Sequence, residues 1–188
     1  MDMGKLRQTI SILALAAVIA SGCTSKPQTK QTAPTPQETP TDYAGWTVGS
    51  FTDEFGDKTD SRFLRNIYQG KISTISLGDI NMTAKCTIDS SAFRIEFYDY
   101  GKYLIKNFGQ SELRIKDTNG KVHEFCQFSN DGMRFIHSLR DSIINILCHN
   151  GTMKASVRIE ENSNGRHGSF SIKGTDKLKE LMTAANVK

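Results

Sequence analysis

The stretch that decides the fold is Ile80-Asn81-Met82-Thr83-Ala84-Lys85-Cys86-Thr87-Ile88, in which apolar and polar residues alternate strictly. A period of two is typical of a β-strand that buries one of its faces. We therefore expect a strand over residues 80–88. Its buried face should carry Ile80, Met82, Ala84, Cys86 and Ile88.

The residues downstream predict that this strand folds back on a partner. Asp89-Ser90-Ser91 supplies turn-forming residues, and beyond it apolar residues again occupy every second position. Further short runs follow, and the alternation is least regular after the turn signal Asp117-Thr118-Asn119-Gly120. The apolar residues of these strands are Phe93, Ile95 and Phe97; Leu113 and Ile115; Val122, Phe125 and Phe128; Met153, Ala155, Val157 and Ile159; and, after a turn from Asn162 to Gly168, Phe170 and Ile172.

Two segments have helical spacing instead. The first has Ser138 and Asp141 in a capping arrangement, and Gly151 beyond it can supply a left-handed stop. The second is short and follows Thr175, a residue type that caps helix N-termini. Their apolar faces carry Leu139, Ile143, Ile146 and Leu147 in the first helix, and Leu178, Leu181 and Met182 in the second.

Strands dominate this pattern, and the helices serve as covers. Such a pattern is typical of architectures built from antiparallel sheets. We expect a mainly β domain over residues 43–188, an antiparallel β-sandwich or open barrel with two short covering helices. That length suits a single domain with one core.

The charge pattern argues against one class of partner. The chain has 24 Lys and Arg residues against 20 Asp and Glu, a formal net charge of +4 in 188 residues. Basic and acidic residues are interspersed and form no run. A nucleic-acid binder carries a basic patch or stripe, so we expect no nucleic-acid partner.

The N-terminal segment has the features of a signal peptide. Lys5 and Arg7 precede an apolar run from Ile10 to Ala20, which has the length of a signal-peptide core. A run of this length is too short to span a bilayer, which takes about 20 residues. We expect residues 1–22 to be removed.

The residues that end this run, Ala20-Ser21-Gly22-Cys23, resemble the lipobox of bacterial lipoproteins. The resemblance implies that the Cys23 thiol is acylated and that Cys23 becomes the first residue of the processed chain. It also implies a membrane partner through this lipid, and a place in the bacterial cell envelope, at the outer membrane. Two or more acyl chains anchor a protein stably, whereas one does so only marginally.

The segment 23–42 has the composition of a tether. It is rich in Thr, Gln and Lys, lacks large apolar residues and contains all four prolines, Pro27, Pro34, Pro36 and Pro40. Such a segment cannot bury enough apolar surface to offset the entropy cost of ordering it. We expect an extended spacer between the anchor and the domain.

The order of elements in the domain resembles a second family. It is similar to the TagO-type domains associated with bacterial type VI secretion, and Trp46 with the segment 53–57 resembles uncharacterised lipoproteins of Bacteroides-like bacteria. The resemblance implies a β-sandwich accessory protein of the envelope with no known enzymatic activity. The residues that carry it are Leu113-Arg114-Ile115-Lys116, Phe128-Ser129-Asn130-Asp131-Gly132, a helix ending near Leu147, Ala155-Ser156-Val157-Arg158-Ile159 and Gly168-Ser169-Phe170-Ser171-Ile172-Lys173-Gly174.

Catalytic motifs are absent from the sequence. His123-Glu124-Phe125-Cys126-Gln127 lacks the second His of the H-E-x-x-H zinc motif and falls in a predicted strand. His137, Ser138 and Asp141 offer the side chains of a triad, but they crowd one helix start, where Ser and Asp are better explained as caps. We therefore expect that the protein is not an enzyme. An envelope hydrolase whose site has no sequence signature remains the alternative.

Metal and disulfide chemistry also have weak candidates. The acidic segment 53–60 has oxygen ligands that suit calcium, but its spacing is not that of an EF-hand. Cys126, Cys148, His123 and His149 are ligand types for zinc without zinc spacing. We therefore expect no metal and no cofactor. If Cys23 is lipidated, Cys86, Cys126 and Cys148 remain, so at most one internal disulfide can form.

A contact patch is the remaining functional candidate. Tyr98, Tyr100 and Tyr103 surround Gly101, and tyrosine offers contact area at low entropy cost. The alternative is a purely structural role, in which these residues complete the edge of a sheet. The sequence thus predicts a lipid-anchored module that binds a protein or glycan partner as part of an envelope or secretion assembly.

Overall fold

Strands make up most of the computed structural model, which describes residues 43–74, 78–100, 102–106, 109–129, 132–159 and 165–187. The predicted signal peptide and tether lie outside these residues. The strands are β1 (Thr47–Thr52), β2 (Lys58–Thr74), β3 (Gly78–Ile88), β4 (Ala92–Asp99), β5 (Tyr103–Leu104), β6 (Gly109–Lys116), β7 (Val122–Ser129), β8 (Met133–Ile136), β9 (Gly151–Ile159) and β10 (Arg166–Gly174). The helices are α1 (His137–Leu147) and α2 (Leu178–Ala184).

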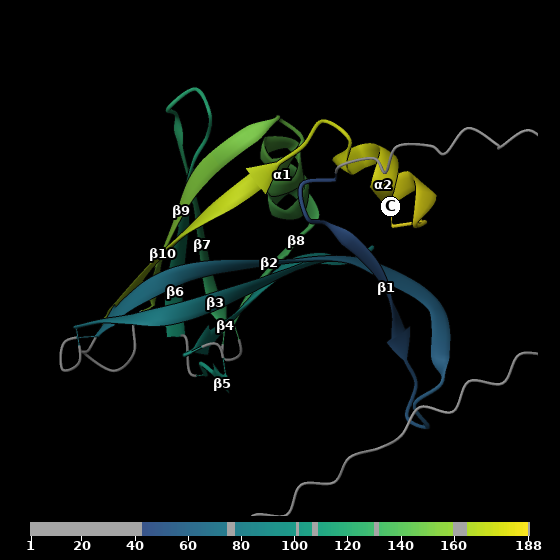
Figure 1. Ribbon diagram of the computed structural model, residues 1–188, viewed down its shortest axis with the longest axis horizontal. Coiled ribbons are helices and arrows are strands. Elements are labelled where there is room, and N and C mark those ends of the chain that lie inside the picture. Colours follow the sequence, from purple (N-terminus) through teal and green to yellow (C-terminus); the bar gives the residue numbers. More distant parts are fainter. Residues whose placement is uncertain are drawn as a thin grey trace, which may run out of the picture. The chain divides into compact units, whose positions relative to one another are not determined.

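All ten strands belong to one open antiparallel sheet (Figure 1). Its main path runs β5-β4-β3-β2-β10-β9-β6-β7, with β1 beside β2 and β8 beside β4. The prediction of a mainly β, antiparallel fold with two short helices is confirmed. Two of the pairings, β2 with β10 and β6 with β9, join strands that are distant in sequence.

The hairpin of β3 and β4 has the predicted register. Ile88 lies opposite Phe93, and Cys86 lies opposite Ile95. Both strands bury alternate residues, and Met82, Ala84, Cys86 and Ile88 are fully buried, while Ile80 packs partly buried against the core. The alternation in the sequence thus marks the inner face of the sheet correctly.

The strands β6, β9 and β10 also bury the predicted residues. Leu113 and Ile115 of β6 are fully buried. The four alternating apolar residues of β9 are at most 2% exposed, and Phe170 and Ile172 of β10 are at most 5% exposed. β7 is the exception. Phe125 is buried, but Val122 is 49% exposed because it faces outward in the ladder with β6.

β1 and β2 are not predicted from the sequence, although β2 is the longest strand. β2 pairs with β1, β3 and β10, so it lies at the centre of the sheet. Its inward positions include Asn66 and Gly70 among Leu64, Tyr68 and Ile72. The polar and the small residue interrupt the apolar alternation, which explains why the pattern is hard to recognise.

The sheet curls so that β7 and β8, near its two borders, come together. The backbone N–H of Arg134 in β8 donates to Gln127 Oε1 of β7 at 3.0 Å. The rings of Phe125 and Phe135 pack edge to face with centroids 6.0 Å apart. Among the described residues no backbone ladder joins these two strands, so the sheet stays open there.

The helix α1 lies against β4, β8 and β10 (Figure 1) and buries Ile143, Ile146 and Leu147 as predicted. Its start and end differ from the prediction. The N-cap residue is Ile136, which has no side chain to accept a hydrogen bond, so the predicted Ser138 cap is wrong. The C-cap is Cys148, and Gly151 begins β9 instead of ending the helix. Leu139, expected in the core, is 41% exposed.

The helix α2 buries the predicted residues Leu178, Leu181 and Met182. Its N-cap is Lys177, which makes no side-chain capping bond. The buried Thr175 lies one turn earlier, where its hydroxyl accepts a hydrogen bond from the Lys177 N–H at 3.3 Å. Thr175 thus organises the chain just before the helix and does not cap it.

Candidate functional site

Cys23, the predicted lipidation site, lies outside the described residues, so its acylation stays a prediction. The prediction for Cys23 therefore rests on the sequence alone. Within the part of the chain that the structure describes, no helix has both the length and the apolar character needed to cross a bilayer.

The three tyrosines predicted as a contact patch lie around the short edge formed by β4 and β5. Asp99 pairs with Tyr103 across this ladder. Because adjacent residues of a strand point to opposite faces and paired residues share a face, Tyr103 and Tyr98 point to opposite faces. Tyr98 is partly buried and its hydroxyl donates to Glu96 at 3.1 Å, whereas Tyr100 and Tyr103 are 62% and 61% exposed. Binding at these residues stays a prediction.

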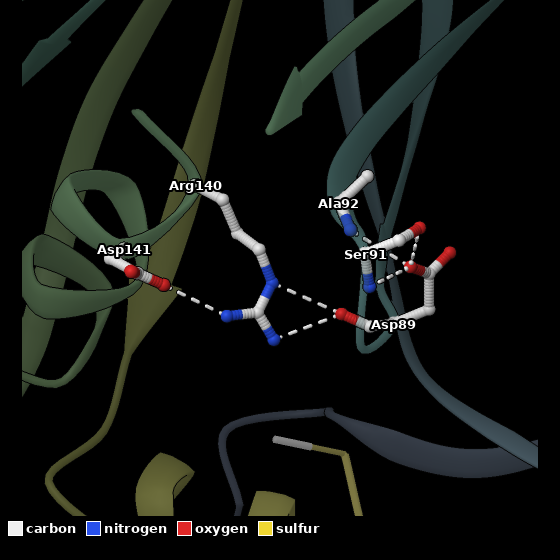
Figure 2. A network of polar contacts seen from close by, with 5 residues as sticks. All are labelled: Asp89, Ser91, Ala92, Arg140 and Asp141. Atoms are coloured by element: carbon white, nitrogen blue, oxygen red, sulfur yellow. Dashed lines mark hydrogen bonds and ion pairs between the residues drawn. The ribbon is translucent and has the colours of Figure 1, made fainter. Parts of the chain in front are cut away.

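A buried polar network connects α1 to the β3–β4 turn (Figure 2). The guanidinium of Arg140 donates from Nε and Nη2 to the Asp89 carbonyl oxygen at 3.1 and 2.9 Å, and from Nη1 to Asp141 Oδ1 at 2.9 Å. The Asp89 carboxylate accepts from the backbone N–H groups of Ser91 and Ala92 at 2.7 and 2.8 Å, and from the Ser91 hydroxyl at 2.7 Å.

The electrostatics of Asp89 favour its charged form. Burial opposes ionisation, but the hydrogen bonds from Ser91 and Ala92 and the nearby Arg94 guanidinium outweigh it and lower the pKa of the Asp89 carboxyl. Arg140 and Asp89 are both less than a tenth exposed and fully engaged with protein groups. This network therefore fixes α1 to the sheet.

An open groove lies on the outer side of the sheet, over β2, β10, β9 and β6. Its volume is about 410 Å³, and its lining includes Lys71, Arg114, Arg158 and His167. The alternation that buries one face of each strand turns these side chains outward. Serine hydroxyls lie between the charged groups, which gives the groove a polar lining.

The ladder register aligns these outward side chains in rows across the strands. Lys71 lies opposite Ser169, Ser169 opposite Ser156, and Ser156 opposite Arg114. A second row contains His167, Arg158 and Glu112, and a third contains Ser171, Lys154 and Lys116. We call this surface the basic face and define it by its six basic side chains: Lys71, Arg114, Lys116, Lys154, Arg158 and Lys173.

Three acidic side chains lie near the basic face: Asp79 and Glu112 line the groove, and Glu124 lies opposite Arg114. Arg114 contacts Glu112 through Nε and also lies 3.2 Å from Glu124 Oε1. The hydrogen bond that Arg114 donates to Glu112, together with the charges of both carboxylates, raises the pKa of the Arg114 guanidinium. Among the described residues no carboxylate forms an ion pair with Lys71, Lys116, Lys154 or Lys173. The face as a whole is therefore positive.

Sequence reasoning missed the basic face because its residues come from four separate strands. The chain shows no basic run, yet each of the six residues occupies a polar position of an alternating strand. For the five residues on β6, β9 and β10 the alternation alone predicts an outward position, whereas Lys71 lies on β2, whose alternation is interrupted. The missing information is which strands are neighbours, and the pairings of β2 with β10 and of β6 with β9 supply it.

A second cavity, of about 470 Å³, lies between the β6–β7 turn and α1 and contains an Asp–His pair. His123 Nε2 donates to Asp117 Oδ2 at 2.9 Å. This bond, with backbone N–H groups of Lys121 and Asn119, lowers the pKa of the Asp117 carboxyl. Ser142 and His149 line the same cavity from the helix side, but no hydrogen bond joins them to His123 among the described residues.

The remaining candidates of the sequence analysis are dispersed. Ser138 and His137 lie exposed at the start of α1. Cys86, Cys126 and Cys148 are all free, and burial raises the pKa of Cys86, which is a small core residue. Within the described ranges no three His, Cys, Asp or Glu side chains gather closely enough to hold a metal ion.

Comparisons with protein-family models, with curated proteins and with solved structures found no match to this chain.

Proposed function

We propose that the protein is a lipid-anchored binding or accessory module of the bacterial cell envelope, held at the outer membrane through Cys23. The observation that carries the binding role is the basic face, a broad polar surface that four strands present in register. A surface of this kind suits contact with an extended partner. The anchoring role rests on the residues 10–23 and the proline-rich segment that follows.

The proposal gives each part of the chain a task. The lipid on Cys23 fixes the chain to the membrane, and the segment 23–42 lets the β domain move relative to it. The domain then binds an envelope component, either a protein or a glycan of an envelope or secretion assembly. The resemblance to TagO-type domains supports an accessory role of this kind.

Acyl labelling tests the anchoring part of the proposal. In bacteria fed an alkyne-bearing fatty acid, the wild-type chain should incorporate the label and Cys23→Ala should not. Cys126→Ala is the matched control, because Cys126 is an exposed free cysteine of the domain, and it should label like wild type. Equal labelling of Cys23→Ala and wild type would contradict lipidation at Cys23.

An envelope hydrolase is the rival function, and one observation favours it. A carboxylate that orients an imidazole, as Asp117 does with His123, is the arrangement of a general base. If the protein is such an enzyme, it should hydrolyse chromogenic ester or peptide substrates, and His123→Gln should remove that activity. We expect wild type and His123→Gln to be equally inactive.

A further inference from the structure

The basic face contains a pair of like charges that should destabilise the folded domain. Lys116 of β6 and Lys154 of β9 lie directly opposite each other in the ladder and are both exposed. Side chains that face each other in this way have Cβ atoms about 5 Å apart, and like charges at this position destabilise the sheet. The pair therefore costs stability in the isolated domain unless an anion lies over it.

Neighbouring strands extend this positive surface across the sheet, from β9 through β10 to β2. Lys71 lies on β2 and Lys173 on β10, and both are exposed. Of the carboxylates near this surface, Glu112 and Glu124 already contact Arg114, while the exposed Asp79 lines the same groove as Lys71. Among the described residues no carboxylate forms an ion pair with Lys116 or Lys154, so an added anion would meet this pair without displacing an acidic side chain.

Hydroxyl groups fill the positions between the lysines. Ser171 lies opposite Lys154, and Ser169 lies opposite Lys71. Lysine ammonium and serine hydroxyl groups both donate hydrogen bonds to phosphate oxygens. Neighbouring strands are about 4.8 Å apart, so the lysines are spread over a surface and do not converge on one point. Such a layout suits many separate phosphate groups better than one small ligand.

We propose that the basic face docks on the anionic phosphate headgroups of a lipid surface. Basic residues near such a surface each add to the attraction, and salt screens it. The inference rests on the proposed function, because the lipid on Cys23 and the segment 23–42 would hold the domain close to headgroups. A high effective concentration makes a weak surface contact useful.

Vesicle binding by the chain of residues 23–188 carrying Cys23→Ser, which has neither the predicted signal peptide nor a site for the lipid, tests this inference. The chain is purified in detergent, transferred to vesicles by detergent removal and sedimented. We expect about tenfold stronger binding to vesicles that contain phosphatidylglycerol than to vesicles of phosphatidylcholine alone, and a loss of this preference when salt screens the charges. Equal binding to both vesicle types would overturn the inference.

Two triple variants separate the basic face from the general charge of the chain. Lys71→Gln, Lys116→Gln and Lys154→Gln together should remove the preference for phosphatidylglycerol. Lys58→Gln, Lys106→Gln and Lys177→Gln remove the same charge from exposed positions off the face and should retain it. The face variant should also unfold at the same or a higher temperature than wild type, because it loses the Lys116–Lys154 repulsion. Equal vesicle binding by the two triple variants would contradict the docking role.

A soluble probe distinguishes lipid headgroups from free phosphate. Inositol hexakisphosphate, titrated into the same chain in detergent, should bind much more weakly than the vesicle surface does. Tight binding of this probe without a preference for anionic vesicles would show that the face takes a soluble phosphate compound, and would overturn the membrane assignment.

The two proposals fail in different ways. If the wild-type chain incorporates the acyl label but the Cys23→Ser chain shows no preference for anionic vesicles, only the docking inference is contradicted. If the Cys23→Ser chain prefers anionic vesicles through its basic face but the wild-type chain incorporates no label, only the lipid anchor is contradicted.

Discussion

At the scale of single residues, the core depends on side chains that the alternation of β3 places inward. Ile88 is fully buried, with Leu64 opposite it on one neighbouring strand and Phe93 on the other. Thr87 is the adjacent residue and points to the other face, where it is partly exposed. Substitutions at these two positions therefore test the register of the strand.

Ile88→Ala should lower the free energy of unfolding by about 2–5 kcal/mol, because it removes buried methylene groups and leaves a cavity. Thr87→Ala should cost far less. Denaturant midpoints of the two variants and wild type measure the difference. A larger loss for Thr87→Ala than for Ile88→Ala would mean that the register is displaced by one residue.

Asp89 predicts a dependence of stability on pH. Its folded pKa lies below the unfolded value of about 3.9, so its charge stabilises the folded state above that value, and the contribution is lost as the pH falls through the folded pKa. The difference in unfolding free energy between wild type and Asp89→Asn should therefore be largest near neutral pH and decrease below about pH 4. Asp60→Asn, at an exposed position, is the control. A difference that stays constant in acid would contradict this account of Asp89.

At the scale of elements, the sequence predicts strands with clean alternation and misses those with polar or small inward residues. β3, β4, β9 and β10 were predicted because nearly every inward position is apolar. β2 was not, because Asn66 and Gly70 take inward positions. Asn66 is held by a long-range contact, a hydrogen bond from its Nδ2 to the Ala44 carbonyl at 3.0 Å. Such compensation depends on tertiary structure and has no local signal.

The helix caps show the same limitation. The capping pattern at Ser138 predicts a start, but the chain enters α1 directly from β8, and Asp141 pairs with Arg140 instead. The start of this helix is set by the end of a paired strand and by the buried Arg140 contact to Asp89. Neither is visible in the residues 138–141 themselves.

Gly70 is small because β2 and β10 approach each other closely there. A Cβ at this position would lie 2.3 Å from the Ser169 carbonyl oxygen and 2.7 Å from Phe170 Cβ. Gly70→Ala should therefore force the strands apart and cost about 1–3 kcal/mol in unfolding free energy. The control is Gly165→Ala, where the nearest atom to an added Cβ is 3.7 Å away. Denaturant unfolding that ranks the two variants equally would contradict the close approach of β2 and β10.

At the scale of the whole molecule, the candidate site arises from strand order. The six basic side chains are scattered between residues 71 and 173, and only the long-range pairings of β2 with β10 and of β6 with β9 gather them on one surface. The sequence could therefore predict that the five on β6, β9 and β10 point outward, but not that they are neighbours. The proposed anchor at Cys23 is the opposite case, because its signal is entirely local.

Fractionation of bacterial membranes tests the central claim, that a lipid on Cys23 anchors the domain to the envelope. The account predicts that the wild-type chain stays with the membrane through a wash at high salt and leaves it only in detergent, since an acyl anchor is insensitive to screening. Cys23→Ala should be released by salt or found in the unprocessed form of the chain. Release of the wild-type chain by salt alone, or retention of a processed Cys23→Ala chain, would contradict the account.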